Sequence, residues 1–340
     1  MAARLLDAPL PIVAAPMAGG PTTVALSAAA ARAGAFPFLA GGYRTPGALA
    51  AEIAQLRAAG APFGVNLFVP SGRDVDRAAF RAYAELIAPE AAAHGVRLDP
   101  EPVSDDDRWR EKVEMLVAQP VPVVSLTFGL PSADDVAMLR RAGSRVLASV
   151  TTPAEAQAAR DLGVDGLVVQ GPDAGGHSAT HDPSRTPDPG GTPALVRRVR
   201  EAVALPVVAG GGVDGPAAVA RILDAGAEAV AVGTLLLRTD EAGTSAPHLA
   251  ALADPASGRT VLTRAFTGRP ARALANRFAE RYGEAAPVAY PAVHHLTRAL
   301  RQAALAAGDR EVLHLWAGTG YRAAPSGPVA DVVRWLAGEN

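Results

Sequence analysis

Eight short apolar runs, rich in β-branched residues, recur along the chain and alternate with Ala-rich amphipathic segments. None of the runs alternates apolar with polar residues, so each is expected to form a strand covered on both faces, as in a parallel α/β sheet with helices outside. Eight strand–helix units favour a closed (β/α)8 TIM barrel over a doubly wound open sheet. The predicted strands span residues 11–17, 36–41, 63–68, 121–129, 145–150, 166–171, 206–212 and 229–234.

Local start and stop signals agree with helices between these strands. Thr152 followed by Pro153 combines an N-cap residue with a first-turn proline. Glycines follow the ends of several predicted helices, where a left-handed residue commonly stops a helix. The predicted helices span residues 22–33, 46–59, 132–142, 153–162, 193–203 and 216–225, and the stop glycines are Gly34, Gly60, Gly143, Gly163 and Gly226.

Two regions break the strand–helix rhythm. Residues 74–114 exceed one crossover helix, and we expect a helix plus an elaborated loop at the pocket entrance. Residues 244–310 are too long for a loop and contain no strand candidate, so they are predicted to form a helical lid or small second domain near the C-terminus. Residues 1–240 with 311–340 would form the barrel, the last segment returning to cover its mouth.

The balance of charged residues indicates that the ligand is a small molecule rather than a nucleic acid or a membrane. The 32 Lys and Arg residues balance 34 Asp and Glu residues, so no basic field favours nucleic acid or a membrane surface. The absence of cysteine excludes disulfides, thiolate nucleophiles and cysteine-based metal sites. Neither a signal peptide nor a membrane-spanning run is evident, and we expect a cytoplasmic enzyme. The sequence does not determine the oligomeric state, and a homo-oligomer is one of the alternatives.

Two late strands end in glycine turns typical of phosphate sites. Residues 210–215 satisfy G-x-G-x-x-G between a strand and a helix, but the next strand lacks the acidic tip of a dinucleotide fold. Glycines such as Gly211 and Gly212 instead let backbone N–H groups approach a phosphate, and Gly233 with Thr234 would add an amide and a hydroxyl. The alternative is that these are turn glycines without a ligand.

Two amides, Asn66 and Gln170, stand at or near the ends of strongly apolar strands. A buried amide is costly unless it is hydrogen-bonded. At the barrel mouth these side chains would hydrogen-bond a flat heterocycle, or they would cap neighbouring loop backbone. The residues alone do not separate the two roles.

His177 directly follows a glycine-rich turn after a predicted strand. This position would deliver an imidazole over a bound ligand, as a general base or as a hydrogen-bond partner of an anion. A single loop histidine can also be structural. His181 lies four residues on, in a loop rather than a helix and without a third ligand, so we expect no metal. For His94, His248, His294, His295 and His314 the default prediction is surface or lid packing.

With these elements in place, the chain resembles the nitronate monooxygenase family, formerly 2-nitropropane dioxygenases, which are FMN-dependent (β/α)8 barrels. The resemblance runs along nearly the whole length. Its matching segments, in order, are PIVAAPMAGG at 11–20, GVNLF at 64–68, GPDAGGH at 171–177, PVVAGGG at 206–212, AVGT at 231–234 and WAGTG at 316–320. Asp173, Ala179 and Thr319 depart from common family residues, and the loop after His177 and the segment with Trp316, which hold Ala179 and Thr319, are expected to face substrate.

The resemblance implies FMN as cofactor, His177 as the catalytic histidine, and oxidation of an alkyl nitronate of the propionate 3-nitronate type, or a nitroalkane, with O2. The products would be a carbonyl compound and nitrite. The alternatives are a related FMN barrel using NAD(P)H, of the enoyl-ACP reductase or quinone reductase type, and a non-catalytic flavin-binding module. The implied FMN contacts are Ala15, Met17, Asn66, Gln170, Gly175, Gly211, Gly212, Ala231, Val232, Gly233 and Thr234.

Overall fold

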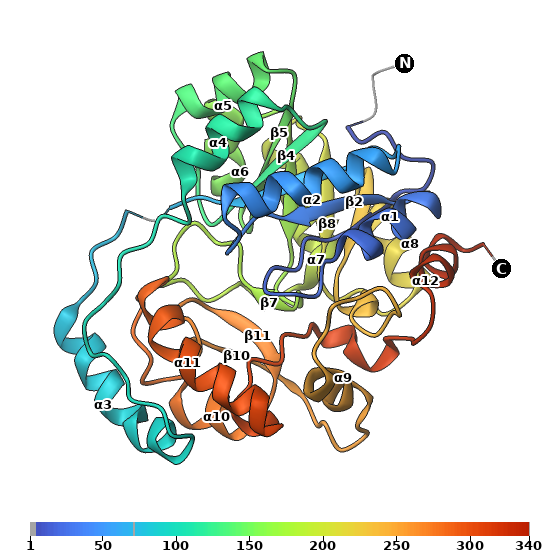
Figure 1. The fold of residues 1–340 in the computed structure, drawn as a ribbon. Coiled ribbons are helices and arrows are strands. Elements are labelled where there is room, and N and C mark those ends of the chain that lie inside the picture. The colour runs from blue at the N-terminus through green and yellow to red at the C-terminus, as the bar shows by residue number, and fades with distance from the viewer. Residues whose placement is uncertain (1–4, 71, 340) are drawn as a thin grey trace.

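The eight predicted strands close into a barrel of parallel strands (Figure 1). The computed structural model describes residues 5–70 and 72–339, so Asn340 lies outside the described residues. The barrel closes where its first strand pairs with its last, with Val13 opposite Ala231. In barrel order the strands are β1 (Ile12–Ala14), β2 (Phe36–Ala40), β3 (Gly64–Phe68), β4 (Val123–Thr127), β5 (Arg145–Val150), β6 (Gly166–Gln170), β8 (Val207–Gly210) and β9 (Ala229–Val232).

Eight helices surround the barrel. Seven of them follow barrel strands in sequence, and the eighth comes from the C-terminus, packing against the first and the last of the seven. The C-terminal helix therefore completes the outer layer, whereas the segment before it lies at the barrel mouth, where the return of the C-terminal segment was predicted. The helices are α1 (Val24–Arg32), α2 (Pro46–Ala58), α4 (Trp109–Ala118), α5 (Ala133–Arg141), α6 (Pro153–Leu162), α7 (Gly191–Ala202), α8 (Pro216–Asp224) and α12 (Val329–Ala337).

The predicted helix signals act as expected. Thr152 is the N-cap of α6, and its hydroxyl accepts the Glu155 N–H at 3.0 Å. Gly163 ends the same helix with φ of 87°, a left-handed conformation that favours glycine. Gly34, Gly60, Gly143 and Gly226 likewise have positive φ just past helix ends.

Side chains inside the barrel change from apolar to polar along β4, β5 and β6. Val123 and Leu147 belong to an interior apolar cluster, which Leu5 and Leu6 of the N-terminal segment join. Residues two and four positions further along the strands point to the same side and are polar, as Thr127 and Ser149 show with Oγ1···Oγ at 3.0 Å. The bottom of the barrel is thus filled with hydrocarbon, and its C-terminal mouth presents hydrogen-bonding groups.

A cap covers that mouth, and it is not purely helical. β10 (Thr260–Thr263) pairs antiparallel with β11 (Ala271–Leu274), which pairs with β7 (Gly176–His177). The prediction that residues 244–310 hold no strand was wrong, because β10 and β11 are only four residues long and one of the two partners of β11 is a two-residue strand about a hundred residues away. The cap helices are α9 (Ala246–Ala253), α10 (Arg277–Tyr282) and α11 (Ala292–Ala307), with short 3-10 turns η1 (Thr234–Leu236), η2 (Arg310–Val312) and η3 (Thr319–Ala323).

The long segment between β3 and β4 supplies a further cap helix, α3 (Arg77–Ala93). Its buried residues Phe80, Tyr83 and Ile87 share one apolar cluster with cap residues such as Phe266. The Tyr83 hydroxyl donates to the Ala265 carbonyl at 2.6 Å. Helix α3 accordingly lies beside α10 and α11, away from the barrel (Figure 1).

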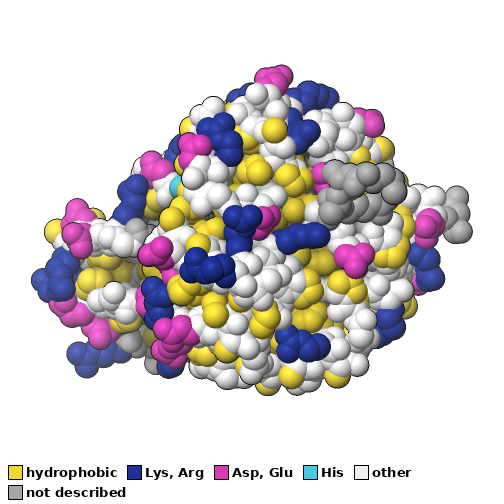
Figure 2. Space-filling model, turned by 90° about the horizontal axis from the view of Figure 1, so that it is seen from above, with side chains coloured by type: hydrophobic (Ala, Val, Ile, Leu, Met, Phe, Trp, Pro, Cys, Tyr) yellow, Lys and Arg dark blue, Asp and Glu magenta, His cyan; other side chains and the backbone are white. Residues whose placement is uncertain are grey.

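Charged side chains of both signs are interspersed over the face shown in Figure 2, with hydrophobic side chains between them. This distribution agrees with the near balance of acidic and basic residues in the sequence. Among the residues that the structure describes, no helix is long and apolar enough to cross a membrane.

Candidate active site

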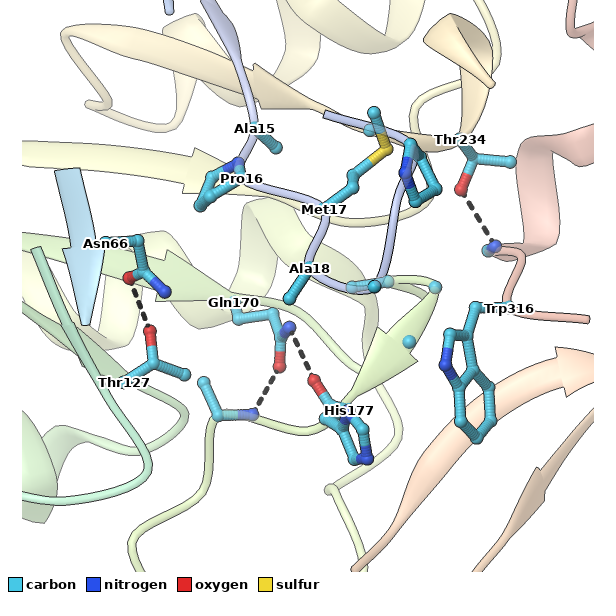
Figure 3. Close-up of a pocket in the computed structure, with 18 of the residues that line it drawn as sticks. Ala15, Pro16, Met17, Ala18, Asn66, Thr127, Gln170, His177, Thr234 and Trp316 are labelled. Carbon is cyan, nitrogen blue, oxygen red and sulfur yellow. Dashed lines mark hydrogen bonds between the residues drawn. The ribbon is translucent and has the colours of Figure 1, made fainter. Parts of the chain in front are cut away.

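A cavity of about 670 Å³ lies between the C-terminal ends of the barrel strands and the cap (Figure 3). Segments from every part of the chain reach it, as expected for the mouth of a barrel. The structure brings all the sequence-predicted site residues into its wall. These are Ala15, Met17, Asn66, Gln170, Gly175, His177, Gly211, Gly212, Ala231, Val232, Gly233 and Thr234.

The glycine turns after β8 and β9 form one side of the cavity. Gly211 and Gly212 have φ of 123° and 71°, which glycine alone adopts without strain. The N–H groups of Gly212 and Gly233 have no acceptor in the described part of the chain. Thr234 Oγ1 accepts the Gly318 N–H at 2.9 Å, which leaves its hydroxyl hydrogen to donate. These unused donors, close to the start of α8, suit an anionic phosphate.

The segment after β1 borders the same turns. The Ala15 N–H donates to the Val232 carbonyl at 3.0 Å, and Met17 is held by its N–H bond to Thr22 Oγ1 at 2.8 Å. A Cβ added to Gly233 would meet Met17 Sδ at 3.5 Å. The first and last barrel strands therefore deliver their ends to one edge of the cavity, and Figure 3 shows Ala15 and Met17 on that edge.

The two predicted amides are used differently. Asn66 Oδ1 accepts hydrogen bonds from Ser125 Oγ and Thr127 Oγ1, both at 2.8 Å. The Nδ2 group of Asn66 has no partner among the described residues, and in Figure 3 it points toward the cavity. Gln170 instead binds loop backbone: its Nε2 donates to the His177 carbonyl at 3.0 Å, and its Oε1 accepts the Ala179 N–H at 2.7 Å. Asn66 is thus free to donate to a ligand, whereas Gln170 positions the histidine loop.

His177 projects from β7 with Nε2 2.9 Å from Thr267 Oγ1. Its Nδ1 has no partner among the described residues and is the ring nitrogen left for a ligand. Burial, together with the positive charges of Arg269 and Arg301, lowers the pKa of His177 to about 3. The imidazole is therefore neutral near pH 7.

Comparison with known proteins identifies the chain. Its sequence matches the nitronate monooxygenase family model over residues 5–339. Nitronate monooxygenase from Pseudomonas aeruginosa is 37% identical, with 99% of this chain and 97% of the relative covered. The structure of nitroalkane oxidase from Streptomyces ansochromogenes superposes with a TM-score of 0.92 at 47% identity, covering 98% of this chain and 96% of that one. The chain belongs to the nitronate monooxygenase family.

This membership makes the protein an oxidoreductase. A probable nitronate monooxygenase from Bacillus subtilis is 32% identical, over 92% of this chain and 90% of the relative. FabK from Thermotoga maritima superposes with a TM-score of 0.74 at 24% identity, covering 98% of this chain and 93% of that one, which shows a common fold alone.

The sequence of this nitronate monooxygenase family member did not predict a group of aromatic side chains at the cavity beside His177. The imidazole of His177 has ring centroids of Phe128, Tyr290 and Trp316 within 5.7 Å. Tyr43 stacks on His294 at 4.4 Å. These residues are spread over four separate segments, and no local pattern marks them. Only the segment WAGTG, which contains Trp316, is marked in the sequence, and it is marked by the family resemblance.

The sequence did not predict that cap histidines would reach the cavity. Four of the residues predicted to pack on the surface or in the lid also line the cavity, because the cap folds directly over the barrel mouth; these are His248, His294, His295 and His314. His94 lies elsewhere, 3.1 Å from Asp309. Across residues 5–70 and 72–339, no group of three or more His, Cys, Asp or Glu side chains is arranged to hold a metal ion.

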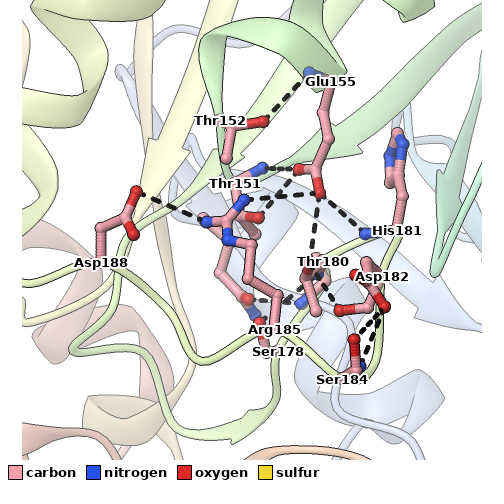
Figure 4. A network of polar contacts seen from close by, with 12 residues as sticks. Thr151, Thr152, Glu155, Ser178, Thr180, His181, Asp182, Ser184, Arg185 and Asp188 are labelled. Atoms are coloured by element: carbon pink, nitrogen blue, oxygen red, sulfur yellow. Dashed lines mark hydrogen bonds and ion pairs between the residues drawn. The ribbon is translucent and has the colours of Figure 1, made fainter.

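A polar network fixes the loop that carries His177 (Figure 4). Glu155 accepts hydrogen bonds from the N–H and hydroxyl of Thr151, from the Thr180 hydroxyl and from the His181 N–H. His181 Nε2 also lies 2.9 Å from the Ser149 carbonyl oxygen. Burial raises the pKa of the Glu155 carboxyl, but electrostatic attraction to His181 together with these bonds holds that pKa below its usual value. His181 is therefore a structural residue of the loop.

Gly175 is needed for close backbone packing. A Cβ at this position would lie 2.4 Å from Gly318 N and 2.6 Å from the Ala317 carbonyl carbon. The histidine loop and the 316–320 segment can touch only because residue 175 is glycine. A cofactor contact at Gly175 stays a prediction.

Proposed function

We propose that the protein binds FMN at the barrel mouth and oxidises alkyl nitronates of the propionate 3-nitronate type with O2, giving a carbonyl compound and nitrite. The cavity fits such a cofactor. Its glycine turns offer unused N–H donors of Gly212 and Gly233 and the Thr234 hydroxyl to a phosphate. Asn66 offers an amide N–H to a heterocycle edge, and the wall is large enough for a ring system. Bound FMN would supply the electron acceptor for the oxidation.

The residues around the cavity favour an anionic substrate. Burial lowers the pKa of His177, and the charges of Arg269 and Arg301 lower it further because they oppose a third positive charge. The same field attracts a nitronate anion. An anion at Nδ1 would select the tautomer with hydrogen on Nδ1, and the Thr267 hydroxyl would then donate to Nε2. His177 would thus hold the nitronate by a hydrogen bond.

Proton abstraction from a neutral nitroalkane is the less favoured use of His177. A base whose conjugate acid has a pKa of about 3 is poorly matched to a carbon acid that is neutral at pH 7. The single observation that carries the proposal is therefore a neutral imidazole with one free nitrogen. It lies in a cavity whose wall contains Arg301 and also the unused donors of the glycine turns.

Anaerobic titration of the purified protein tests the proposal. We expect a flavin spectrum that bleaches with propionate 3-nitronate, returns with O2 and yields nitrite, and that responds far less to the neutral nitroalkane. The His177→Asn variant, which keeps a donor near the position of Nδ1, should retain more nitronate oxidation than His177→Ala. A protein that stays colourless with added FMN would refute cofactor binding. Bleaching by NADH or NADPH and not by nitronate would favour the reductase alternative.

A further inference from the structure

Arg301 is a buried cation in the cavity wall. It lies on α11, is 7% exposed and has no carboxylate among its partners in the described part of the chain. Its Nε donates to Thr297 Oγ1 at 3.1 Å, and Nη2 donates to the His294 carbonyl at 2.9 Å. A buried charge of this kind needs a compensating group.

The carboxylates on the same side of the cavity are already engaged. Asp105 Oδ2 lies 2.8 Å from His295 Nε2, and Asp107 Oδ2 lies 2.7 Å from Lys112 Nζ. Neither compensates the Arg301 charge. The wall around Arg301 therefore carries an unbalanced positive charge.

Arg301 also fixes the hydrogen positions on two neutral imidazoles. Its Nη1 faces His314 Nε2, and its Nη2 faces His294 Nδ1, both at 3.3 Å. A guanidinium can only donate, so both of these imidazole nitrogens must accept. The hydrogens then lie on His314 Nδ1 and His294 Nε2. His314 Nδ1 is buried without a partner, and His294 Nε2 has none among the described residues.

One N–H of Nη1 is also left over, because a guanidinium has five and the described contacts use four. Burial, followed by the charge of Arg301, lowers the pKa of His294 to about 2 and that of His314 well below its usual value, so both rings stay neutral donors. The unused guanidinium N–H of Arg301 and the Nε2–H of His294 lie in one wall of the cavity, and together with the positive charge they form a site for an anionic group.

This cluster shares the cavity with His177 and is separated from it by two aromatic rings. Trp316 lies 5.2 Å from His177 and 5.3 Å from His314 between ring centroids. Tyr290 lies 5.7 Å from His177 and 6.5 Å from His294. A ligand held at His177 by one end could extend past these rings and present its other end to Arg301.

We propose that Arg301 and His294 form a second anion subsite that binds a carboxylate on the tail of the substrate, with His314 accepting from the guanidinium and holding it in place. This proposal rests on the proposed function and adds to it the residues that hold the carboxylate of a nitronate of the propionate 3-nitronate type. The apolar rings between the two ends would contact the connecting chain.

Equilibrium binding to the FMN-loaded protein tests the subsite apart from turnover. Calorimetric titration should show succinate, with two carboxylates, binding about tenfold to a hundredfold more tightly than butanoate, with one. Arg301→Gln should abolish that difference. Arg281→Gln removes an exposed charge on cap helix α10 that does not line the cavity, and it should leave the difference within about twofold. Equal binding of the two acids by the wild type, or an equal loss in Arg281→Gln, would overturn the subsite.

Turnover then links the subsite to the substrate. Arg301→Gln should lower kcat/KM for propionate 3-nitronate about tenfold or more and leave that for butyl nitronate within about twofold. Equal losses on both substrates would mean that Arg301 is merely structural. If Arg301→Gln proves unstable, Arg301→Lys and the methyl ester of the same nitronate on the wild type replace it. We expect Lys to keep part of the preference and the ester to lose it. If no nitronate is oxidised, the proposed function fails, whereas the succinate difference still decides the subsite.

Discussion

Gln170 and His177 are joined by a hydrogen bond in which the side-chain Nε2 of Gln170 donates to the backbone carbonyl of His177 at 3.0 Å. With the second bond, from the Ala179 N–H to Gln170 Oε1 at 2.7 Å, the amide spans the loop on both sides of the imidazole. The barrel strand β6 thereby sets the position of a side chain that belongs to the cap sheet. Precise placement of a reacting group is worth large factors in rate.

Replacing this amide should loosen the histidine without emptying the cofactor site. Gln170→Glu keeps an acceptor for Ala179 but loses the donor to His177 and sets a carboxylate against a carbonyl. We expect kcat/KM for nitronate to fall about tenfold or more, with FMN content nearly unchanged. Gln170→Met removes both bonds at similar volume and should be at least as harmful. Wild-type kinetics in both variants would show that the loop does not need Gln170.

Stability should fall as pH decreases below about 6.5. Burial lowers the folded-state pKa to about 3 for His177, about 4 for His248 and about 2 for His294, and well below the usual value for His314. Between pH 6.5 and 5 the unfolded chain binds protons at these positions and the folded protein does not. Each histidine therefore contributes a slope of up to about 1.4 kcal/mol per pH unit. Burial raises the pKa of Asp107 and of Glu52, and these two groups oppose the trend set by the four histidines.

Chemical denaturation at several pH values between 7.5 and 5 measures this slope. His248→Asn removes one titrating ring and should reduce proton uptake on unfolding by about one proton. A free energy of unfolding that stays constant across this range would contradict the assignment of four neutral buried imidazoles.

Gly175→Ala should separate the histidine loop from the 316–320 segment, because its Cβ would meet Gly318 N at 2.4 Å. Such overpacking against backbone costs about 1–3 kcal/mol, and we expect lower thermal stability together with weaker nitronate binding. Gly47→Ala is the matched control. Gly47 lies on α2, and an added Cβ there has no atom within 4 Å, so this change should be neutral or slightly stabilising. Equal effects of the two changes would argue against the clash.

The sequence predicted the barrel well because its signals are local. Each barrel strand is a short apolar run, and residues such as Thr152 and Gly163 mark helix ends by their own conformational preferences. The resemblance added the order of the loops and thereby the site residues at the strand ends. These residues do meet in one cavity.

The cap could not be predicted in the same way because its structure depends on distant partners. Strand β11 exists through its pairing with β10 and with Gly176 and His177, and four-residue strands carry no clear pattern. Helix α3 has an apolar face, but its sequence does not say whether Phe80 packs on the barrel or on the cap. Likewise, the cluster around Arg301 forms only when α11 and the segment with His314 fold together.

Removing Arg269 should lower the free energy of unfolding and raise the pKa of His177, and the two effects can be measured separately. Its guanidinium is fully buried, with Nε donating to the Ser178 carbonyl at 3.1 Å and Nη2 to the Thr180 carbonyl. It also lies 4.1 Å from the centroid of the Phe128 ring. Arg269→Met would leave buried carbonyls unpaired and should lower the free energy of unfolding by about 2–4 kcal/mol, measured by chemical denaturation.

The same change removes a positive charge that lowers the His177 pKa. The pKa of His177 should therefore rise toward its ordinary value in Arg269→Met, and protonation of His177 would appear at higher pH in the profile of nitronate kcat/KM. Arg269→Lys loses the fork of donors but keeps the charge, so it should share the destabilisation and show a smaller shift of the profile. Profiles that coincide in the wild type and both variants would show that Arg269 acts on the loop alone and not on the charge of the imidazole.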